Sequence, residues 1–340
     1  MEENKKVKIN KTLILTIVML LALVFALSQL DHDNLLYSIS KIPIWSVIVL
    51  ILLQIISVLL VNIQWYQIAQ VTKINISFRN IFFVNSQGYI IDFLARIGGE
   101  IARAVQLKEL GNCSQRQAIA MLLLQKIFSL SAYFAILLFA LGYLLSGNTL
   151  TEIVELRYVI YSIIIIILIL FACLLFFPSQ IKKYLLNRKA FGLKWLSSTY
   201  GFIIILLEQV ENLWDNKIAW LRLALLSIVI WLVYAIQMYV LAIQMMPEVQ
   251  FIYIAAITFV SYMVATIPIF PGGLGGFEGT MTALLFLAGF AMSDAAIITI
   301  LFRFTTFWLL LLIGLVYVTL YKATNKKYQE KEKANNNKKV

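Results

Sequence analysis

Long runs of apolar residues, separated by short polar segments, follow one another along almost the whole 340-residue chain. A helix needs about twenty mainly apolar residues to cross the hydrocarbon core of a bilayer. Six runs reach this length and predict full transmembrane helices: Thr12–Leu30, Ile44–Gln64, Ala118–Leu145, Tyr158–Phe177, Ile218–Gln244 and Ala296–Tyr321. The first run follows a lysine-rich start, as a signal peptide does, but its length and the spans after it favour an anchor.

Two further regions are too interrupted to be simple spans. Phe78–Leu110 is partly apolar but carries charged residues that include Asp92, Arg96, Glu100 and Arg103, and Phe251–Phe290 is broken by prolines and a glycine-rich run. Broken backbone at membrane depth is tolerated only where protein or a water-filled cavity supplies its hydrogen bonds. Each region is therefore either a re-entrant hairpin or a pair of full spans.

The distribution of basic residues favours hairpins. Lys and Arg are enriched in cytoplasmic segments. With the N-terminus in the cytoplasm, the segments between spans one and two and between spans three and four contain only Lys41 and Arg157 as basic residues. This distribution of basic residues requires that Phe78–Leu110 enter and leave the membrane from the cytoplasm. It also requires that Phe251–Phe290 enter and leave the membrane from the other side. The predicted fold is an all-α polytopic membrane protein with about six full spans and two opposed re-entrant helical hairpins, making eight or more membrane segments.

Composition agrees with this fold. Hydrophobic residues make up 61% of the chain and charged residues 13%, and the mean hydropathy is +0.88. Soluble domains are about 45–50% apolar and about 25% charged, so a soluble enzyme, a disordered protein and a secreted disulfide scaffold are excluded. We predict a membrane domain at 12–321, a cytoplasmic tail at 1–11 and a disordered, basic cytoplasmic tail at 322–340.

The net charge of +11 follows the predicted topology. The two tails supply +2 and +5, and Ile181–Lys194 adds five basic residues and no acid. Basic clusters beside apolar spans are typical of the cytoplasmic face, so we expect no nucleic-acid binding. Leu193–Leu213, which is less apolar and contains two glutamates, is predicted to be an amphipathic helix on that face.

The sequence contains few of the residues that a metal-binding or nucleotide-binding site would need. Cys113 and Cys173 are too few for a disulfide framework or a zinc site, and the single histidine, His32, lies in a polar loop. No P-loop pattern is present. We expect neither a metal nor a cofactor.

The first candidate motif lies in the first hairpin. Asp92, Arg96, Glu100 and Arg103 are spaced four, four and three residues apart, and Gly98 and Gly99 lie between them. On a continuous helix this spacing would place the four charges on one face. The glycines instead favour a turn between two half-helices, with Glu100 in the first turn of the second, where the helix dipole stabilises a carboxylate. The alternative is a salt-bridge cluster that only holds the hairpin tip.

The second motif lies in the second hairpin. Prolines end the entering helix, and glycines permit positive φ and close backbone approach. A single charge at the bilayer centre costs about 2.5–3.5 kcal/mol on insertion scales, so Glu278 needs a partner, and Arg303 in the last span is the candidate. A purely structural Glu278–Arg303 pair is the alternative. The backbone motif consists of Pro268, Pro271, Gly272, Gly273, Gly275 and Gly276.

Both interrupted regions place a glutamate within two residues of a Gly-Gly pair. This is a weak sign of an internal inverted repeat, an arrangement typical of secondary transporters. Lys126, inside the third span, is one more charge at membrane depth. It is expected either to neutralise a nearby acid or to extend toward the interface.

These motifs resemble those of the lysylphosphatidylglycerol synthase transmembrane-region family. The matching residues are Gly-Gly-Glu-x-x-Arg in the first half, Pro-x-x-Pro-Gly-Gly-x-Gly-x-x-Glu in the second, and the later Arg303. The resemblance spans about Ile44 to Tyr321. The family usually has a proline some residues after this arginine, where this chain has Trp308 and Leu309.

The resemblance implies a flippase-like domain in the cell membrane, multi-pass, with both termini in the cytoplasm. This is the integral membrane part of multiple peptide resistance factors, which protect against antibiotics, and it also occurs alone. Full-length members carry a soluble domain that transfers an aminoacyl group from tRNA to phosphatidylglycerol. Only nineteen polar residues follow Tyr321, so this chain resembles the translocating part without the synthetic part.

The favoured interpretation is a lipid translocase. Its substrate would be a membrane phospholipid or a polyprenyl-phosphate-linked lipid. The substrate-binding side chains would be Arg96, Glu100, Arg103, Glu278 and Arg303, supported by Asp92 and Lys126. Arginine suits phosphate because its planar fork donates two parallel hydrogen bonds.

Two other functions stay open. One is phosphatidylglycerol lysyltransferase activity, which alone would require a nucleic-acid partner, tRNA; the residues show no nucleophile–base pair for it. The other is an accessory subunit of a synthase or lipid-linked glycan enzyme. The lipid, the direction of transport and the oligomeric state do not follow from the sequence.

Overall fold

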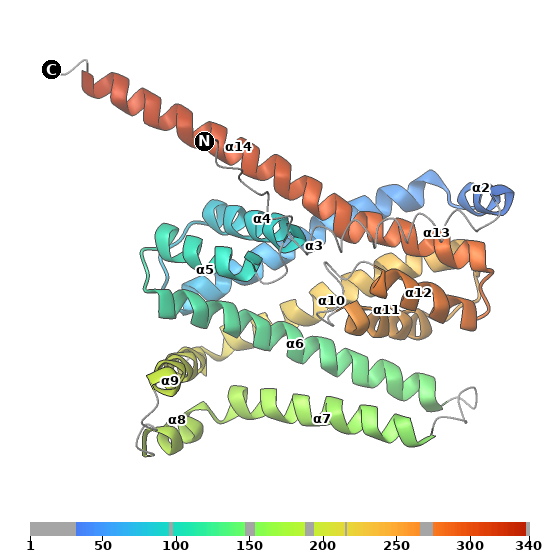
Figure 1. The fold of residues 1–340 in the computed structure, drawn as a ribbon, viewed down its shortest axis with the longest axis horizontal. Coiled ribbons are helices and arrows are strands. Elements are labelled where there is room, and N and C mark those ends of the chain that lie inside the picture. The colour runs from blue at the N-terminus through green and yellow to red at the C-terminus, as the bar shows by residue number, and fades with distance from the viewer. Residues whose placement is uncertain are drawn as a thin grey trace, which may run out of the picture.

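The computed structural model describes residues 32–94, 98–146, 154–187, 194–214, 216–265 and 275–337. These residues form a bundle of helices, without strands (Figure 1). In chain order the helices are α2 (His32–Ser40), α3 (Ile44–Val71), α4 (Phe78–Leu94), α5 (Gly98–Leu110), α6 (Gln115–Ser146), α7 (Val154–Phe176), α8 (Pro178–Asn187), α9 (Lys194–Trp214), α10 (Lys217–Met245), α11 (Phe251–Ala265), α12 (Gly276–Leu287), α13 (Met292–Arg303), the π-helical turn η3 (Phe304–Leu309) and α14 (Leu310–Asn337).

The long apolar helices confirm a polytopic membrane protein. Four segments are long and apolar enough to cross a bilayer: Ile44–Val71, Gln115–Tyr143, Lys217–Met245 and Met292–Thr324. A fifth candidate combines the end of α7 with α8, which turns away from it by 83° at Pro178. The predicted span Thr12–Leu30 and the tail at 1–11 lie outside the described residues.

Each of the two interrupted regions forms a pair of short helices. α4 and α5 contain 17 and 13 residues, and α11 and α12 contain 15 and 12. At 1.5 Å per residue these helices are about 18–26 Å long, less than the hydrocarbon thickness of about 30 Å. In Figure 1 the α4–α5 pair occupies the left half of the bundle and the α11–α12 pair the right half, as two opposed hairpins would.

Each half of the chain packs one of its short helices against a long helix of the other half. In each half a long helix is followed by two short helices and another long one: α3 to α6, then α10 to α14. α4 packs against α14 of the second half, and α11 packs against α6 of the first half. α3 and α10 pack against each other between them. This reciprocal arrangement is what an inverted repeat predicts.

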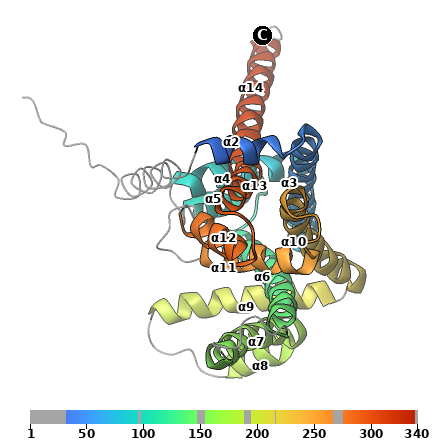
Figure 2. The ribbon, with the colours of Figure 1, turned by 90° about the vertical axis from the view of Figure 1, so that its right-hand side faces the viewer.

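Two peripheral elements differ in part from the sequence-based expectations. α9 runs across the bundle, nearly end-on in Figure 1 and lengthwise in Figure 2, as a surface helix would. Its apolar side, which includes Leu207, Val210 and Leu213, is buried against the bundle. α9 is therefore part of the packed helical bundle. The tail after Tyr321, predicted to be disordered, continues α14 as a helix to Asn337.

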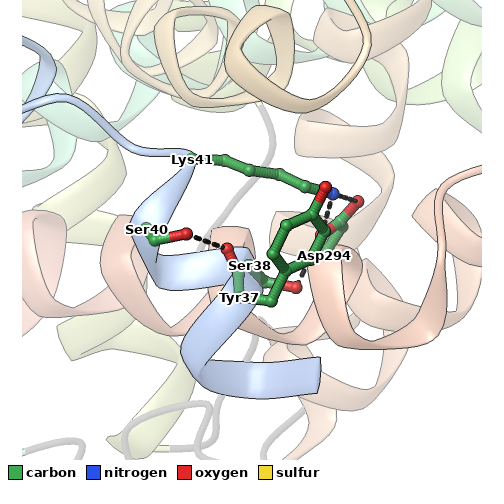
Figure 3. A network of polar contacts seen from close by, with 5 residues as sticks. All are labelled: Tyr37, Ser38, Ser40, Lys41 and Asp294. Atoms are coloured by element: carbon green, nitrogen blue, oxygen red, sulfur yellow. Dashed lines mark hydrogen bonds and ion pairs between the residues drawn. The ribbon is translucent and has the colours of Figure 1, made fainter. Parts of the chain in front are cut away.

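On the opposite end of the bundle from α8 and α9, a polar contact joins α2 to α13. Ser38 Oγ donates to Asp294 Oδ1 at 2.6 Å, and Lys41 Nζ lies 3.1 Å from Asp294 Oδ2 (Figure 3). Asp294 is in the first turn of α13, where a negative charge is favourable next to the free amides of the helix. The contact holds α2 against the start of the last span.

Candidate functional site

The charged residues of the first hairpin meet at one place. The Arg103 Nη1 lies 2.9 Å from Asp92 Oδ2 and 3.1 Å from Glu100 Oε1. Lys126 Nζ, from α6, lies 2.8 Å from the same Glu100 oxygen. The predicted neutralisation of an acid by Lys126 is therefore confirmed. Two acids and two bases balance one another, as buried charges require.

Two glycines make this cluster possible. A methyl group at Gly88 would overlap the Arg103 guanidinium, and one at Gly99 would overlap the Asp92 carboxylate. The prediction that Gly98 and Gly99 break the helix is wrong in detail: α4 ends at Leu94, and both glycines belong to the first turn of α5. Glu100 lies in that turn, as expected.

The cluster lines a cavity of about 220 Å³ where five helices converge. Arg103 is almost completely buried, whereas Glu100 and Lys126 are partly exposed, with 33% and 47% of their side chains accessible. Arg103 Nε and Asp92 Oδ1 are buried without a hydrogen-bond partner. The lining residues are Val61, Gln64, Trp65, Asn85, Tyr89, Asp92, Glu100, Arg103, Gln125, Lys126, Ser129, Ile230, Trp231 and Tyr234.

Uncharged polar side chains of α3, α4 and α6 complete the wall, and the sequence analysis did not select them. Gln125 Nε2 donates to Gln64 Oε1 at 3.3 Å, and Gln64 Nε2 donates to Ser227 Oγ at 2.6 Å. Asn85 Nδ2 donates to Asn62 Oδ1 at 3.0 Å. Amides inside apolar spans were the available signal, since polar groups at membrane depth are costly and mark functional or structural sites.

The second motif forms a separate ion pair. Arg303 Nε donates to Glu278 Oε1 at 2.8 Å, and both side chains are buried. The second Glu278 oxygen accepts from the Gly275 amide at 2.6 Å, which satisfies a backbone donor at the start of α12. Gly275 has a φ of 80°, which only glycine adopts without strain. The predicted pairing of Glu278 with Arg303 is confirmed.

The two clusters do not share the described cavity. Glu278 and Arg303 are absent from its lining. The guanidinium of Arg303 lies over the Phe307 ring, 4.3 Å from its centroid, and Phe307 contacts Phe93 near the tip of α4. An aromatic contact thus connects the pair to the first hairpin. Arg96, Pro268, Pro271, Gly272 and Gly273 lie outside the described residues, and Gly276 is the first residue of α12.

A sequence model of the lysylphosphatidylglycerol synthase TM region matches residues 12–314. The chain belongs to this family. Two archaeal relatives of this chain are UPF0104 membrane proteins. The one from Methanocaldococcus jannaschii is 23% identical over 330 residues, which cover 93% of this chain and 97% of the relative. The one from Pyrococcus horikoshii is 25% identical over 295 residues, which cover 80% and 86%.

Proposed function

We propose that this family member moves a phospholipid or a polyprenyl-phosphate-linked lipid between the two leaflets. The head group would enter the cavity between α3, α4, α5, α6 and α10, while the acyl chains stay in the bilayer. The observation that carries the proposal is the balanced cluster of Asp92, Glu100, Arg103 and Lys126, which lines a cavity at the tip of a half-span hairpin.

The chemistry of the cluster suits a charged head group. Moving an ion through hydrocarbon is costly because the ion loses its hydration. A phosphate would compete with the two carboxylates for Arg103, whose Nε has no partner, and for Lys126, which is half exposed. An ammonium group, where the lipid has one, would take the place of Lys126 beside Glu100.

The proposed orientation places α8 and α9 at the cytoplasmic face of the cell membrane, with both termini in the cytoplasm. Support comes from the basic residues near the helix ends on that side, which include Lys108, Arg116, Lys182, Lys183 and Lys217. On the α2 side, Lys41 pairs with Asp294, so its charge is neutralised. The first hairpin then opens toward the cytoplasm and the second away from it.

Flipping in proteoliposomes tests the proposal. The substrates are phosphatidylglycerol and a polyprenyl phosphate with fluorescent chains, and leaflet-selective quenching reports the transfer. We expect Lys126→Gln and Glu100→Gln to slow flipping by about 10- to 100-fold, the equivalent of one lost charged hydrogen bond. Lys183→Gln on α8, an exposed charge away from the cavity, is the matched control and should flip at the wild-type rate.

The same preparation separates the alternatives. If both cavity variants are folded and flip like the wild type, the cavity is not the transport site. Purified protein is also incubated with lysyl-tRNA and labelled phosphatidylglycerol, since an aminoacylated product would indicate a transferase instead of a carrier.

A further inference from the structure

A second cavity, of about 330 Å³, lies between α6, α7 and α10 and is almost entirely apolar. Its walls extend along all three helices, from Phe128 to Ala135, from Leu168 to Phe176 and from Trp220 to Ile228. Seven or eight residues of helix correspond to about 11–12 Å, so the cavity follows the helix direction. It shares no lining residue with the charged cavity.

The cavity is continuous with the outer surface of the bundle. Phe176 and Ile228, which line it, are 49% and 38% exposed. The neighbouring side of α7 is strongly apolar and exposed, with Ile166 and Leu170 more than half accessible. In a membrane-spanning bundle such a surface faces lipid, so the molecules that reach this cavity come from the bilayer.

Two buried hydrogen-bonding groups interrupt the apolar wall. Trp220 Nε1 and Ser131 Oγ line the cavity and have no hydrogen-bond partner. By contrast, Trp231 Nε1 donates to the Ser129 carbonyl oxygen at 2.8 Å. Ser227 donates to the carbonyl four residues earlier, whereas Ser131 has no such bond. An unsatisfied buried donor costs about 1–3 kcal/mol, so an acceptor from outside the chain would stabilise this site.

The position of Trp220 near the start of α10 suits the ester region of a glycerolipid. Trp220 lies in the first turn of α10, and its ring contacts Trp214 and Phe176 at 5.5 Å between centroids. Such aromatic clusters occupy the membrane interface. Ser131 lies near the middle of α6, about 4.5 Å further along that helix than Phe128, which contacts Trp220. A donor at the interface above an apolar cavity suits a chain that begins with an ester.

We infer that this cavity binds one acyl chain of an ester-linked glycerolipid, with Trp220 donating to an ester carbonyl oxygen and the chain lying between α6, α7 and α10. Ser131 is the second donor, further along α6. The inference goes beyond the proposed function, because it concerns lipid binding at a site separate from the charged cavity and holds whether or not the protein translocates lipid.

Photocrosslinking in vesicles tests this site. The purified full chain is reconstituted into phosphatidylglycerol vesicles that contain a trace of phosphatidylglycerol with a diazirine on one chain. The probe is made in two forms, with the chain joined by an ester or by an ether, because the ether has no carbonyl to accept from Trp220. Labelled peptides are identified by mass spectrometry, and we expect labelling of α6, α7 and α10.

Filling the cavity should remove the label. Ala224→Phe places a ring inside the cavity, and we expect labelling of these peptides to fall about fivefold or more, because a packed site cannot hold both the ring and the chain. Leu225→Phe is the matched control: it is the next residue on α10, faces outward with 52% exposure, and should label like the wild type. Ala172→Leu repeats the test from α7, should Ala224→Phe not fold.

Removing the donor should affect only one probe. Trp220→Phe keeps the aromatic packing and should lower ester-probe labelling by about three- to tenfold, the worth of one net hydrogen bond, while ether-probe labelling stays unchanged. Equal loss with both probes would contradict the hydrogen bond. Undiminished labelling in folded Ala224→Phe and Ala172→Leu, or an equal loss in Leu225→Phe, would overturn the site.

Discussion

The charged cluster depends on residues that have no charge. Gly88 on α4 and Gly99 on α5 leave space for the guanidinium of Arg103 and the carboxylate of Asp92. Only because these side chains fit between the two short helices can one arginine bind two acids while it remains buried. The sequence predicted the pairing of Glu278 with Arg303, and it offered a salt-bridge cluster around Glu100 as one of two alternatives. It did not predict the space that they need, because close approach between helices depends on tertiary packing.

Gly88→Ala tests this dependence at the level of one methyl group. The new Cβ would overlap the Arg103 guanidinium, so we expect a loss of about 1–3 kcal/mol of stability, typical of overpacking. Gly142→Ala on α6 is the matched control. Its Cβ would meet nothing within 4 Å, and alanine is about 1 kcal/mol better than glycine inside a helix. Thermal unfolding in detergent measures both. A Gly88→Ala protein as stable as Gly142→Ala would show that the cluster can shift freely.

At the scale of elements, long apolar runs and their polar interruptions predicted the long helices and the two interrupted regions, whereas α2 and α8 were not predicted. The predicted region Phe78–Leu110 begins and ends where α4 and α5 do. The π-helical turn after Arg303 and the burial of one side of α9 were not predicted, since both depend on neighbouring helices. Likewise, Gln64 and Gln125 belong to unremarkable apolar spans and become part of a cavity wall only when α3 and α6 meet α4 and α5.

The contact between α8 and α9 gives a pH-dependent prediction. Lys182 Nζ lies 2.9 Å from Glu211 Oε2 and 3.4 Å from Glu208 Oε1. The hydrogen bond from Lys182, assisted by Ser179, holds the pKa of Glu211 below its ordinary value of 4.5. The same hydrogen bond raises the pKa of Lys182. The pair therefore stabilises the fold above the ordinary pKa of Glu211, and this contribution is lost as the pH falls through the lowered pKa.

Glu211→Gln should accordingly reduce stability at neutral pH, by about 1 kcal/mol or less because the pair is partly exposed. The difference from the wild type at neutral pH should shrink at acidic pH, once the pH has fallen through the lowered pKa of Glu211 and its carboxyl is protonated. Melting temperatures at the two pH values measure this, with Glu109→Gln, an exposed glutamate on α5, as the control. A difference that stays constant with pH would mean that Glu211 acts through packing alone.

On the scale of the whole molecule, the two hairpins are opposed, and each packs against the last long helix of the other half. This exchange places the tip of α4 beside η3, where Phe93 contacts Phe307, which in turn contacts Arg303. Movement of one hairpin therefore changes the surroundings of the other half's ion pair. Such an exchange of contacts between the two halves is the arrangement expected of an inverted repeat.

The opposed hairpins make a definite prediction about which loops share a side of the membrane. In the predicted hairpin, the turn before α4 and the turn after α5 emerge on the same side of the membrane. Single cysteines at Asn75 and Arg116, both exposed, should react with a membrane-impermeant maleimide from one side. Cysteines at Glu248 and Met292, which flank the second hairpin and are also exposed, should react only from the other. The native Cys113 and Cys173 are first replaced by serine.

Two full spans in either region would also return its flanking turns to one side, so the two pairs of cysteines alone do not distinguish hairpins from full spans. A cysteine at Gly98, at the tip of the first hairpin, does: full spans would expose it on the side of Glu248, whereas a hairpin leaves it unreactive there or accessible only from the side of Asn75.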